Sequence, residues 1–339
     1  MLHIHNGDSA ADTAKQSSLP GEHLAWRESL ITGPTPAGLT DDEWLLLRAR
    51  HLSASYGVDL QECEQSLRQQ EETLRSSAQH DEVVLWFEHD LFCQVHLLYL
   101  LNWFSRRDEI NNPGKTKLSL ICVGEFPGKE TFRGLGELNA GQLASLFPDR
   151  QQVTSRQLKL ASSAWGAYCS ANPTDIEKVL QGDTSPLPFL LAALQAHLRR
   201  FPDTENGLGR IEHRALKLIQ EGCKTFGTLF SRFGDEEPVY GFGDAQFWLT
   251  LRRMSAAQKP LLTIATGKNS EDEGNGERGP RLPTPEVVWN AEFKLTELGQ
   301  SALRSEVDFV KLNGIDLWLG GVHLYDKTKP WRWSVDHIV

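Results

Sequence analysis

The feature that most constrains this chain is a series of short apolar segments that alternate with helical patterns over the first 150 residues. The segment 82–87 (Glu-Val-Val-Leu-Trp-Phe) is almost continuously apolar, which is typical of a strand buried on both faces. Segments 2–5, 23–28 and 118–123 also have strand-like patterns. Strands that alternate with helices predict an α/β fold with a mostly parallel sheet and flanking helices.

After residue 150 the sequence pattern is mainly helical rather than alternating. A length of 339 residues predicts about two domains. We expect an α/β domain over 1–150 that carries the functional site, a helical connector over 151–205, and a winged-helix-like domain over 206–339. Three helical patterns and a β-hairpin pattern support the last assignment. The stretch near 267–285 is rich in Gly, Pro and charged residues, which predicts a disordered loop.

Composition argues against several classes of protein. The apolar runs are far shorter than the ~18 residues needed to cross a bilayer, and the first residues read as a strand rather than a signal peptide. The five cysteines show no paired spacing, which indicates reduced thiols. We therefore expect a cytoplasmic protein with no membrane partner. The net charge of −10 opposes broad, sequence-independent nucleic-acid binding. The polar residues described next favour a small-molecule ligand instead.

Polar residues follow each predicted strand of the α/β domain. In open parallel sheets, ligands bind at the carboxyl ends of the strands, where loops turn into helices. The residues at these ends are Asn6, Gly7, Asp8 and Ser9, then Arg27 and Glu28, then Glu88, His89 and Asp90, and finally Gly124 and Glu125. Because these ends share one edge of the sheet, the sequence predicts a single site there.

The turn at 6–9 has two interpretations. In one, Gly7 lets the backbone approach a ligand, and the helix start that contains Ser9 attracts an anion such as phosphate, with Asn6 nearby. In the other, Asp8 or Ser9 only caps the helix and Gly7 only makes the turn. The four residues alone leave both open.

The triplet at 88–90 places three ionisable groups directly after a buried strand. Glu88, His89 and Asp90 can act as general acid and base, with Asp8 as a further carboxylate, or can bind a divalent metal. The alternative is that Asp90 caps the next helix and the other two are solvated.

Arg27 is a candidate clamp for a phosphate or carboxylate, with Glu28 orienting it. A surface or structural ion pair is the alternative.

Two other patterns carry less weight. His3 and His5 share one face of the first strand, a spacing that metal hydrolases use, and Asp8 is a candidate third ligand, but a pair of histidines without confirmed further ligands is weak evidence. The Gly-Asp-Ser turn at 7–9 is similar to the nucleophile block of GDS-type esterases. Those enzymes also need an Asp-x-x-His pair, and here Asp336 directly precedes His337.

The motifs His3-Ile4-x-Asn6-Gly7-Asp8-Ser9, Trp26-Arg27-Glu28 with Gly33-Pro34, and the run from 85 to 94 resemble an uncharacterised bacterial family with an N-terminal HIxNGDS motif. The resemblance covers about the first 125 residues and brings no established activity. It implies that the polar motif positions form the site: Asn6, Asp8, Ser9, Arg27, Glu88, His89, Asp90 and Gln94. It also implies that His5 is not a metal ligand, because that position is usually apolar in the family.

These observations favour an enzyme, a hydrolase or transferase, that acts on a phosphorylated or nucleotide-like small molecule. A ligand-sensing transcriptional regulator with a C-terminal winged helix and a non-catalytic adaptor are the alternatives. The sequence names neither a substrate nor a cofactor, although a divalent metal is compatible with the carboxylates.

Overall fold

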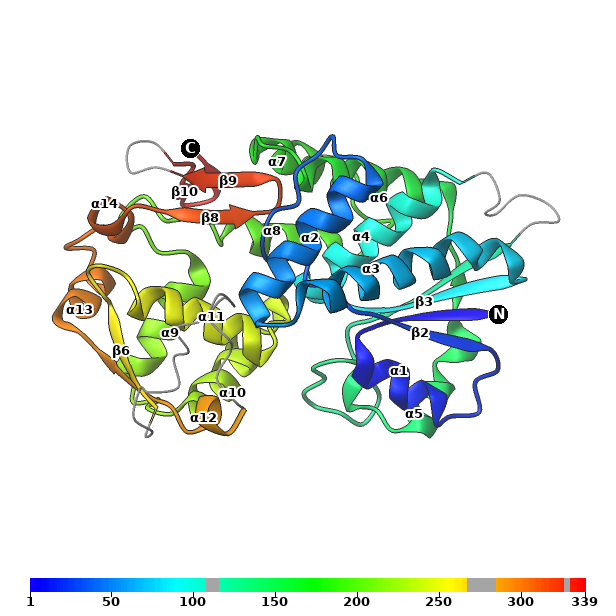
Figure 1. Cartoon of the computed structure of the whole chain (residues 1–339), viewed down its shortest axis with the longest axis horizontal. Helices are drawn as coiled ribbons and strands as arrows, with labels where there is room; N and C mark the ends of the chain where they lie inside the picture. The colour runs from blue at the N-terminus through cyan, green and yellow to red at the C-terminus, as the bar shows by residue number, and fades with distance from the viewer. Residues whose placement is uncertain (108–115, 267–284, 326–329) are drawn as a thin grey trace.

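A five-stranded sheet in the order β2-β1-β3-β4-β5 forms the centre of the α/β part (Figure 1). This computed structural model describes residues 1–107, 116–266, 285–325 and 330–339. The strands are β1 (Leu2–Asn6), β2 (Glu22–Trp26), β3 (Glu82–Glu88), β4 (Lys117–Val123) and β5 (Gln151–Gln152). The first four are parallel neighbours, which confirms the four predicted strands. The short antiparallel β5, which was not expected, pairs with β4.

The strand order places a topological switch point between β1 and β3. From β1 the chain moves outward to β2 on one side, and from β3 it moves outward to β4 on the other. Ile4 pairs with Leu24 of β2 and with Leu85 of β3, so β1 is central. In sheets of this type the two crossovers leave the switch point in opposite directions and open a crevice at the carboxyl ends of the strands.

Helices cover both faces of the sheet. Val84 and Trp86 pack with Ala10 of α1 (Asp8–Lys15) and Leu143 of α5 (Ala140–Ser145). Leu85 and Phe87 face the other way, into a larger core that includes α4 (Leu91–Ser105). This division follows from the alternation of side chains along a strand and from right-handed crossovers. The mixed α/β class and the flanking helices of the prediction are therefore confirmed.

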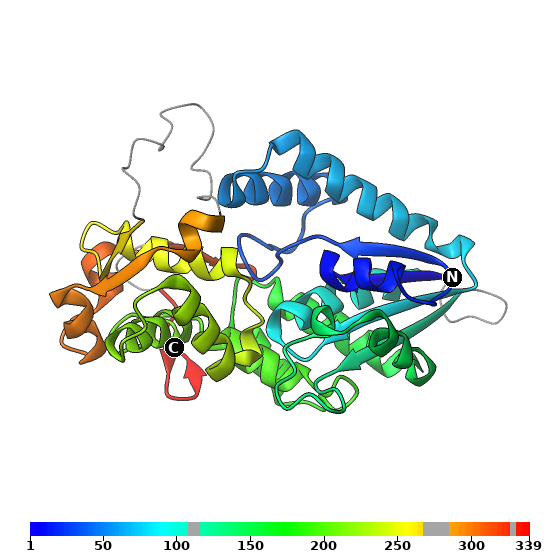
Figure 2. The ribbon, with the colours of Figure 1, turned by 90° about the horizontal axis from the view of Figure 1, so that it is seen from below.

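The remaining helices of this part pack around α4 and β2. α2 (Asp41–Tyr56) and α3 (Leu60–Arg75) form a pair beside the sheet, seen in blue in Figure 2. α6 (Ser155–Tyr168) and α8 (Leu190–Leu198) pack against α4, and α7 (Thr174–Leu180) joins them. Thr40 starts α2 with a reciprocal capping box to Glu43, as its position before an acidic turn favours. The 3₁₀ turns are Ser76–Gln79, Leu135–Glu137, Phe147–Asp149 and Pro238–Tyr240.

The C-terminal part is built from helices and small antiparallel sheets. Its helices are α9 (Arg210–Gln220), α10 (Phe226–Glu236), α11 (Asp244–Ser255), α12 (Pro285–Trp289), α13 (Glu297–Leu303) and α14 (Phe309–Asn313). The strand pairs are β6 (Leu262–Ala265) with β7 (Glu292–Leu295), β8 (Asp316–Leu319) with β9 (Val322–Tyr325), and β10 (Trp333–Ser334) with β11 (His337–Ile338). The predicted disordered loop lies, from 267 to 284, outside the described residues. Within the described ranges, no helix has the length and apolar character of a membrane span.

A buried ion pair organises the segment that follows β2. The Arg48 guanidinium of α2 donates to the Glu28 carboxylate at 2.7 and 3.1 Å, and to the backbone carbonyls of Ser29, Thr32 and Pro34. Both side chains are almost fully inaccessible, at 0% and 3% exposure. Burial opposes the charge on Glu28, but Arg48 and the Ser29 amide together hold its pKa below the usual value.

We expect Glu28→Gln to lower the free energy of unfolding by about 3 kcal/mol or more, because it leaves the Arg48 charge buried without a counter-ion. Urea denaturation followed by circular dichroism measures the change. The matched control is Asp41→Asn, which breaks the exposed pair with Arg75 and should have no measurable effect. Equal stability of Glu28→Gln and the parent chain would contradict this role.

Candidate functional site

Two carboxylates and a thiol meet where β3 turns into α4. Glu88 is the last residue of β3, Asp90 is the N-cap of α4, and Cys93 is the third residue of the helix. The Asp90 side chain accepts the Cys93 backbone N–H at 2.9 Å, so the capping interpretation of Asp90 is confirmed. One oxygen of each carboxyl and the Cys93 sulfur all lie within 4.8 Å of one another, and all three residues are buried.

Cys93 connects this cluster to the end of β1, across the switch point. Its thiol donates to Glu88 Oε2 at 2.5 Å and accepts the Asn6 side-chain amide at 2.7 Å. The side-chain amide oxygen of Asn6 (Oδ1) lies 2.9 Å from His96 Nδ1. His96 Nε2 accepts the Leu30 N–H at 3.1 Å, so Nδ1 carries the proton and donates to Asn6. Burial lowers the pKa of His96 to about 3, which keeps this ring neutral.

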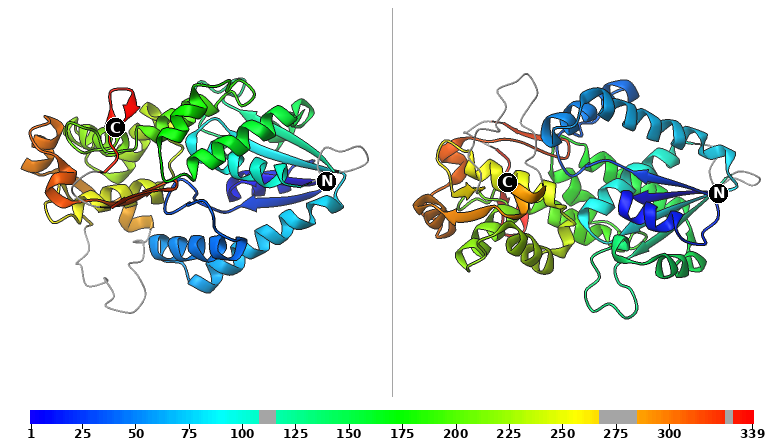
Figure 3. Two further views of the ribbon diagram at one scale, coloured as in Figure 1. Left: turned by 90° about the horizontal axis from the view of Figure 1, so that it is seen from above. Right: turned by 60° about the horizontal axis from the view of Figure 1, so that its bottom comes forward.

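Two glycine turns press against the carboxyls. A Cβ on Gly134, which has φ 148°, would lie 2.9 Å from Glu88 Oε1, and the next amide, Leu135 N–H, donates to that oxygen at 2.5 Å. Gly241, with φ 60°, lies directly against the Asp90 carboxyl, and a side chain there would collide with it. Gly241 follows the 3₁₀ turn Pro238–Tyr240 of the C-terminal part. The cluster therefore lies where the two parts of the chain meet. Figure 3 shows these two parts of the ribbon from two further sides.

The electrostatics of the cluster are those of a proton-holding or cation-binding site. Burial, reinforced by the neighbouring Asp90, raises the pKa of Glu88 to about 7. Burial also raises the pKa of Asp90 and takes that of the Cys93 thiol well above its usual value. Among the described residues, no Lys or Arg forms an ion pair with Glu88 or Asp90. The pair can thus keep one proton near neutral pH, or a divalent cation can replace the protons.

The start of α1 lies at the same edge. Gly7 is the N-cap, with φ 88° and no side-chain cap, so the interpretation of Asp8 or Ser9 as the cap is wrong. The Ser9 hydroxyl instead donates to the Gly136 carbonyl at 3.2 Å. Because Leu135 contacts Glu88, the turn at 134–136 joins the start of α1 to the carboxylate cluster.

Arg27 and Glu28 follow β2 but have different partners. Arg27 pairs with Asp8 at 2.6 Å, and both side chains are about half exposed. Glu28 pairs with Arg48 inside the protein, so the expectation that Glu28 orients Arg27 is wrong. Arg27, which is exposed, can bind another anion in place of Asp8 with little loss of stability. Separating Glu28 from Arg48 would instead leave a buried charge without a counter-ion.

The other predicted residues surround the cluster. Gln94 donates to the Glu88 carbonyl at 2.7 Å and to the Cys122 sulfur at 3.3 Å, which holds the end of β3. His89 packs edge-on against Phe189, with ring centroids 6.0 Å apart, and its Nδ1 is buried without a hydrogen-bond partner among the described residues. His89 is thus the predicted site residue whose polar atom is least engaged by the protein.

The two histidines of β1 lie elsewhere. His3 and His5 point to the α1 face, where they stack at 6.2 Å and contact Trp86. His3 Nε2 donates to the Pro20 carbonyl at 3.0 Å and Nδ1 accepts from Trp86 at 3.0 Å, so both of its nitrogens are engaged. These contacts give His3 a structural role.

Sequence reasoning missed Cys93, His96 and Gly241. The position of Cys93 was accessible in principle, because the third residue of a helix faces its N-cap, here Asp90. His96 lies one turn after Phe92 in an apolar helix and carries no local signal. Gly241 comes from the other part of the chain, so only the tertiary structure reveals its contact with Asp90.

No known protein family matches this chain, and no curated protein is similar enough to count as a relative.

We expect the stability of Glu88→Gln to rise relative to the parent chain as the pH increases from about 5 to about 8. A pKa raised from 4.5 to about 7 means that folding favours the protonated Glu88. Its contribution is complete below pH 4.5 and is lost as the pH rises through 7, by about 3 kcal/mol in total. Urea unfolding at several pH values measures this. Glu72→Gln, at an exposed position of α3, is the control, and an equal pH response of both variants would contradict the shifted pKa.

Proposed function

We propose that this protein is an enzyme, a hydrolase or transferase, that acts on a phosphorylated or nucleotide-like small molecule at the carboxyl edge of β1 and β3. One observation carries the proposal: two buried carboxyls, Glu88 and Asp90, lie together at the switch point, and no Lys or Arg of the described residues pairs with them. Structural carboxylates at such depth are normally paired with cations, as Glu28 is with Arg48. Unpaired carboxyls at this depth are typical of sites that transfer a proton or bind a cation.

The proposed role of Glu88 is general acid and base. With a pKa of about 7, Glu88 can both donate and accept a proton at neutral pH, because its protonated and ionised forms have similar free energies there. Asp90 keeps that pKa high by its proximity, and the Cys93 thiol and the Leu135 amide orient the Glu88 oxygens. His89, whose Nδ1 has no protein partner in the described part of the chain, would contact the substrate.

A phosphate group would lie at the start of α1. Gly7 leaves the backbone approachable, Ser9 offers a hydroxyl, and the first turn of the helix carries partial positive charge. Arg27 at the rim would exchange part of its contact with Asp8 for the anion. Asn6 joins this anion site to the carboxylates through Cys93.

The same cluster would accept a divalent metal. Two carboxylate oxygens and one thiolate within 4.8 Å form a donor set that suits a borderline-soft ion of the zinc class better than magnesium. The ion would lower the pKa of the Cys93 thiol and supply Lewis acidity, while Asn6 and Leu135 keep the ligands in place.

The C-terminal part offers less support for a regulator. We propose that α9, α10, α11 and the β6–β7 pair form a winged helix, supported by the bridge between Thr225 and Glu292 beside β7. Several of its arginines are paired with carboxylates, which reduces their availability for phosphates. These arginines are Arg210, Arg214, Arg232 and Arg253. A packing or protein-contact role therefore fits this module better than DNA binding.

Membership of the HIxNGDS family remains part of the proposal. It is supported by the motif residues themselves, because Asn6, Glu88 and Gln94 are linked by contacts around one cluster.

We expect a panel of nucleotides and sugar phosphates, tested with Mg²⁺, Mn²⁺ and Zn²⁺, to contain a substrate whose turnover falls about 10²-fold or more in Glu88→Gln and Asp90→Asn. Ligand at 100 times its dissociation constant should add about 2.7 kcal/mol of stability in a thermal-shift screen. Ser9→Ala should weaken binding and leave the chemical step less affected. Glu72→Gln, at an exposed position of α3, is the matched control. Full turnover in folded Glu88→Gln would contradict the proposed site.

We also expect no gel shift with random duplex DNA at micromolar protein, because a module with paired arginines should bind non-specifically only at about 10⁻⁴ M or above. Selection from genomic fragments tests specific binding. Recovery of a reproducible site that Arg252→Ala/Arg253→Ala abolishes would overturn the enzyme proposal in favour of the regulator.

A further inference from the structure

The turn 134–136 is bonded to both halves of the proposed site. The Gly136 carbonyl accepts the Ser9 hydroxyl at 3.2 Å, and a Cβ on Gly136 would lie 2.8 Å from that hydroxyl oxygen. One residue earlier, the Leu135 N–H donates to Glu88 Oε1 at 2.5 Å. The hydroxyl proposed to hold a phosphate and the carboxyl proposed to move a proton therefore share one partner. A substrate that used both groups would compete with this turn for them.

The carboxyls are too enclosed to receive a ligand unless part of the enclosure moves. Glu88 is 8% exposed and Asp90 is 4% exposed. The strand and the helix that carry them are fixed, because Phe87 and Leu91 are fully buried in the core. The 3₁₀ turn of the C-terminal part is anchored by Tyr240, which is 1% exposed, and it packs against α8. Movement is therefore expected in the other wall, the turn that contacts Glu88.

The segment 124–138, which contains this turn, is built to move. Most of its residues from 125 to 137 are exposed, and its regular structure is one short 3₁₀ turn. Gly128 has φ 82°, and apart from its neighbours in the chain no atom lies within 4 Å of the place that a Cβ would take. Gly134 has φ 148°. Glycine adopts such conformations without steric cost, so both positions suit hinges.

An exposed ion pair fastens the segment to the C-terminal part. Arg133, directly before the turn, pairs with Asp235 of α10, and the two side chains are 46% and 49% exposed. Exposed pairs contribute little free energy and are weakened by salt. The pair therefore biases the position of the turn and still allows a ligand to displace it.

We propose that the turn 134–136 is an autoinhibitory lid. In the resting protein it occupies the partners of the substrate, Ser9 and Glu88, and the Arg133–Asp235 pair keeps it closed. The substrate opens the lid by competing for the same hydroxyl and carboxyl. This inference rests on the proposed function, because it takes Ser9 and Glu88 as the groups that bind the substrate.

Two measurements on the full chain report the opening without a substrate. Hydrogen–deuterium exchange followed by NMR gives the rate at which the Leu135 N–H loses its bond to Glu88. Alkylation of Cys93 by iodoacetamide, followed by peptide mass mapping, gives the accessibility of the cluster beneath the lid. The Leu85 N–H in the middle of β3 is the internal reference, because its residue is fully buried.

A charge reversal and its rescue test the ion pair. Arg133→Asp places a carboxylate opposite Asp235 and should raise both rates about fivefold or more, because repulsion replaces attraction. The exchanged pair Arg133→Asp/Asp235→Arg should return both rates to near the parent values. Arg156→Asp is the matched control, since Arg156 forms an exposed pair with Asp183 on α6, and it should change neither rate.

Unchanged exchange at Leu135 in Arg133→Asp would overturn the lid. Faster exchange at Leu135 with unchanged alkylation of Cys93 would also overturn it, because the turn would then move without opening the cluster. Faster exchange at Leu85 as well would indicate a general loss of stability and would leave the ion pair with a structural role alone.

Inorganic phosphate separates the lid from the proposed function. Saturating phosphate should speed exchange at Leu135 in the parent chain and have no effect in Ser9→Ala, because only the parent offers the hydroxyl that now binds Gly136. A lid that opens in Arg133→Asp but ignores phosphate in the parent chain would support the gating and overturn the anion site at Ser9.

Discussion

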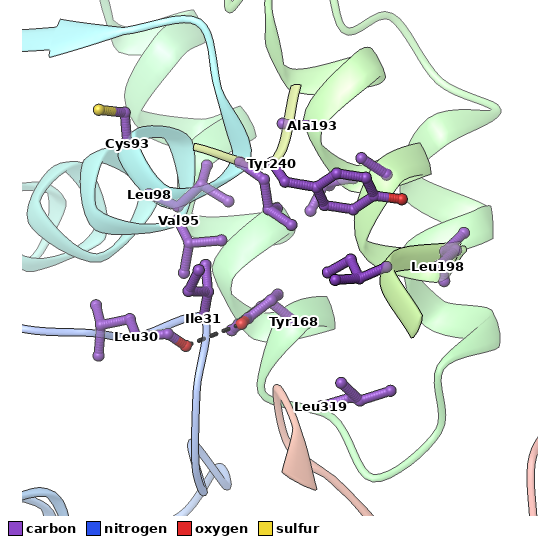
Figure 4. Packing of buried hydrophobic residues seen from close by; sticks show 14 of the residues in the cluster. Leu30, Ile31, Cys93, Val95, Leu98, Tyr168, Ala193, Leu198, Tyr240 and Leu319 are labelled. Carbon is purple, nitrogen blue, oxygen red and sulfur yellow. Dashed lines mark hydrogen bonds between the residues drawn. The ribbon is translucent and has the colours of Figure 1, made fainter. Parts of the chain in front are cut away.

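The pairing of Arg48 with Glu28 is the interaction on which most of this structure depends. A buried guanidinium must have all its donors satisfied, and Arg48 achieves this by binding one carboxylate and three backbone carbonyls of the segment 28–34. The segment so fixed contains no helix or strand, yet hydrogen bonds join it to α6 and to the residues that follow α8. The Tyr168 hydroxyl of α6 donates to the Leu30 carbonyl, and the Arg200 guanidinium donates to the Ile31 carbonyl. The side chains of Leu30 and Ile31 pack in the core with Val95 and Leu98 (Figure 4).

The segment 28–34 also helps to fix the geometry of the candidate site, through hydrogen bonds that begin at Leu30. The Leu30 N–H selects the tautomer of His96, His96 then orients the Asn6 amide, and Asn6 presents its N–H to the Cys93 sulfur. Cys93 in turn holds one oxygen of Glu88. A chain of four hydrogen bonds therefore runs from an irregular loop to the carboxylate whose pKa is raised. The raised value depends on burial, and burial depends on this packing being kept.

The features that the sequence predicted correctly, such as the buried strand β3 and the N-cap of α4, depend on residues close together in the chain. The run at 82–87 is apolar throughout because β3 is covered on both faces, and its neighbours in the sheet followed from the same alternation of strands and helices. Asp90 caps α4, as its place before an apolar helix suggested. At the strand ends, Asn6 is linked to Glu88 through Cys93, and Asp8 pairs with Arg27, but these partners were not predictable. Glu28 binds Arg48, 20 positions away, and Gly241 reaches Asp90 from the C-terminal part. Such pairs are set by tertiary packing, which no spacing within one segment encodes.

The C-terminal part completes the site as well as packing against it. Gly241 contacts Asp90, and Arg133, which precedes the turn that binds Glu88, forms an ion pair with Asp235 of α10. The two carboxyls are therefore enclosed by one turn from each part, and both turns use a glycine with positive φ because a side chain would strike the carboxyl oxygens. If the C-terminal part were removed, water would reach Asp90, and solvation of the charged forms would return both pKa values towards their ordinary range. The acid–base properties proposed for Glu88 thus belong to the whole chain and would not survive in the α/β part alone.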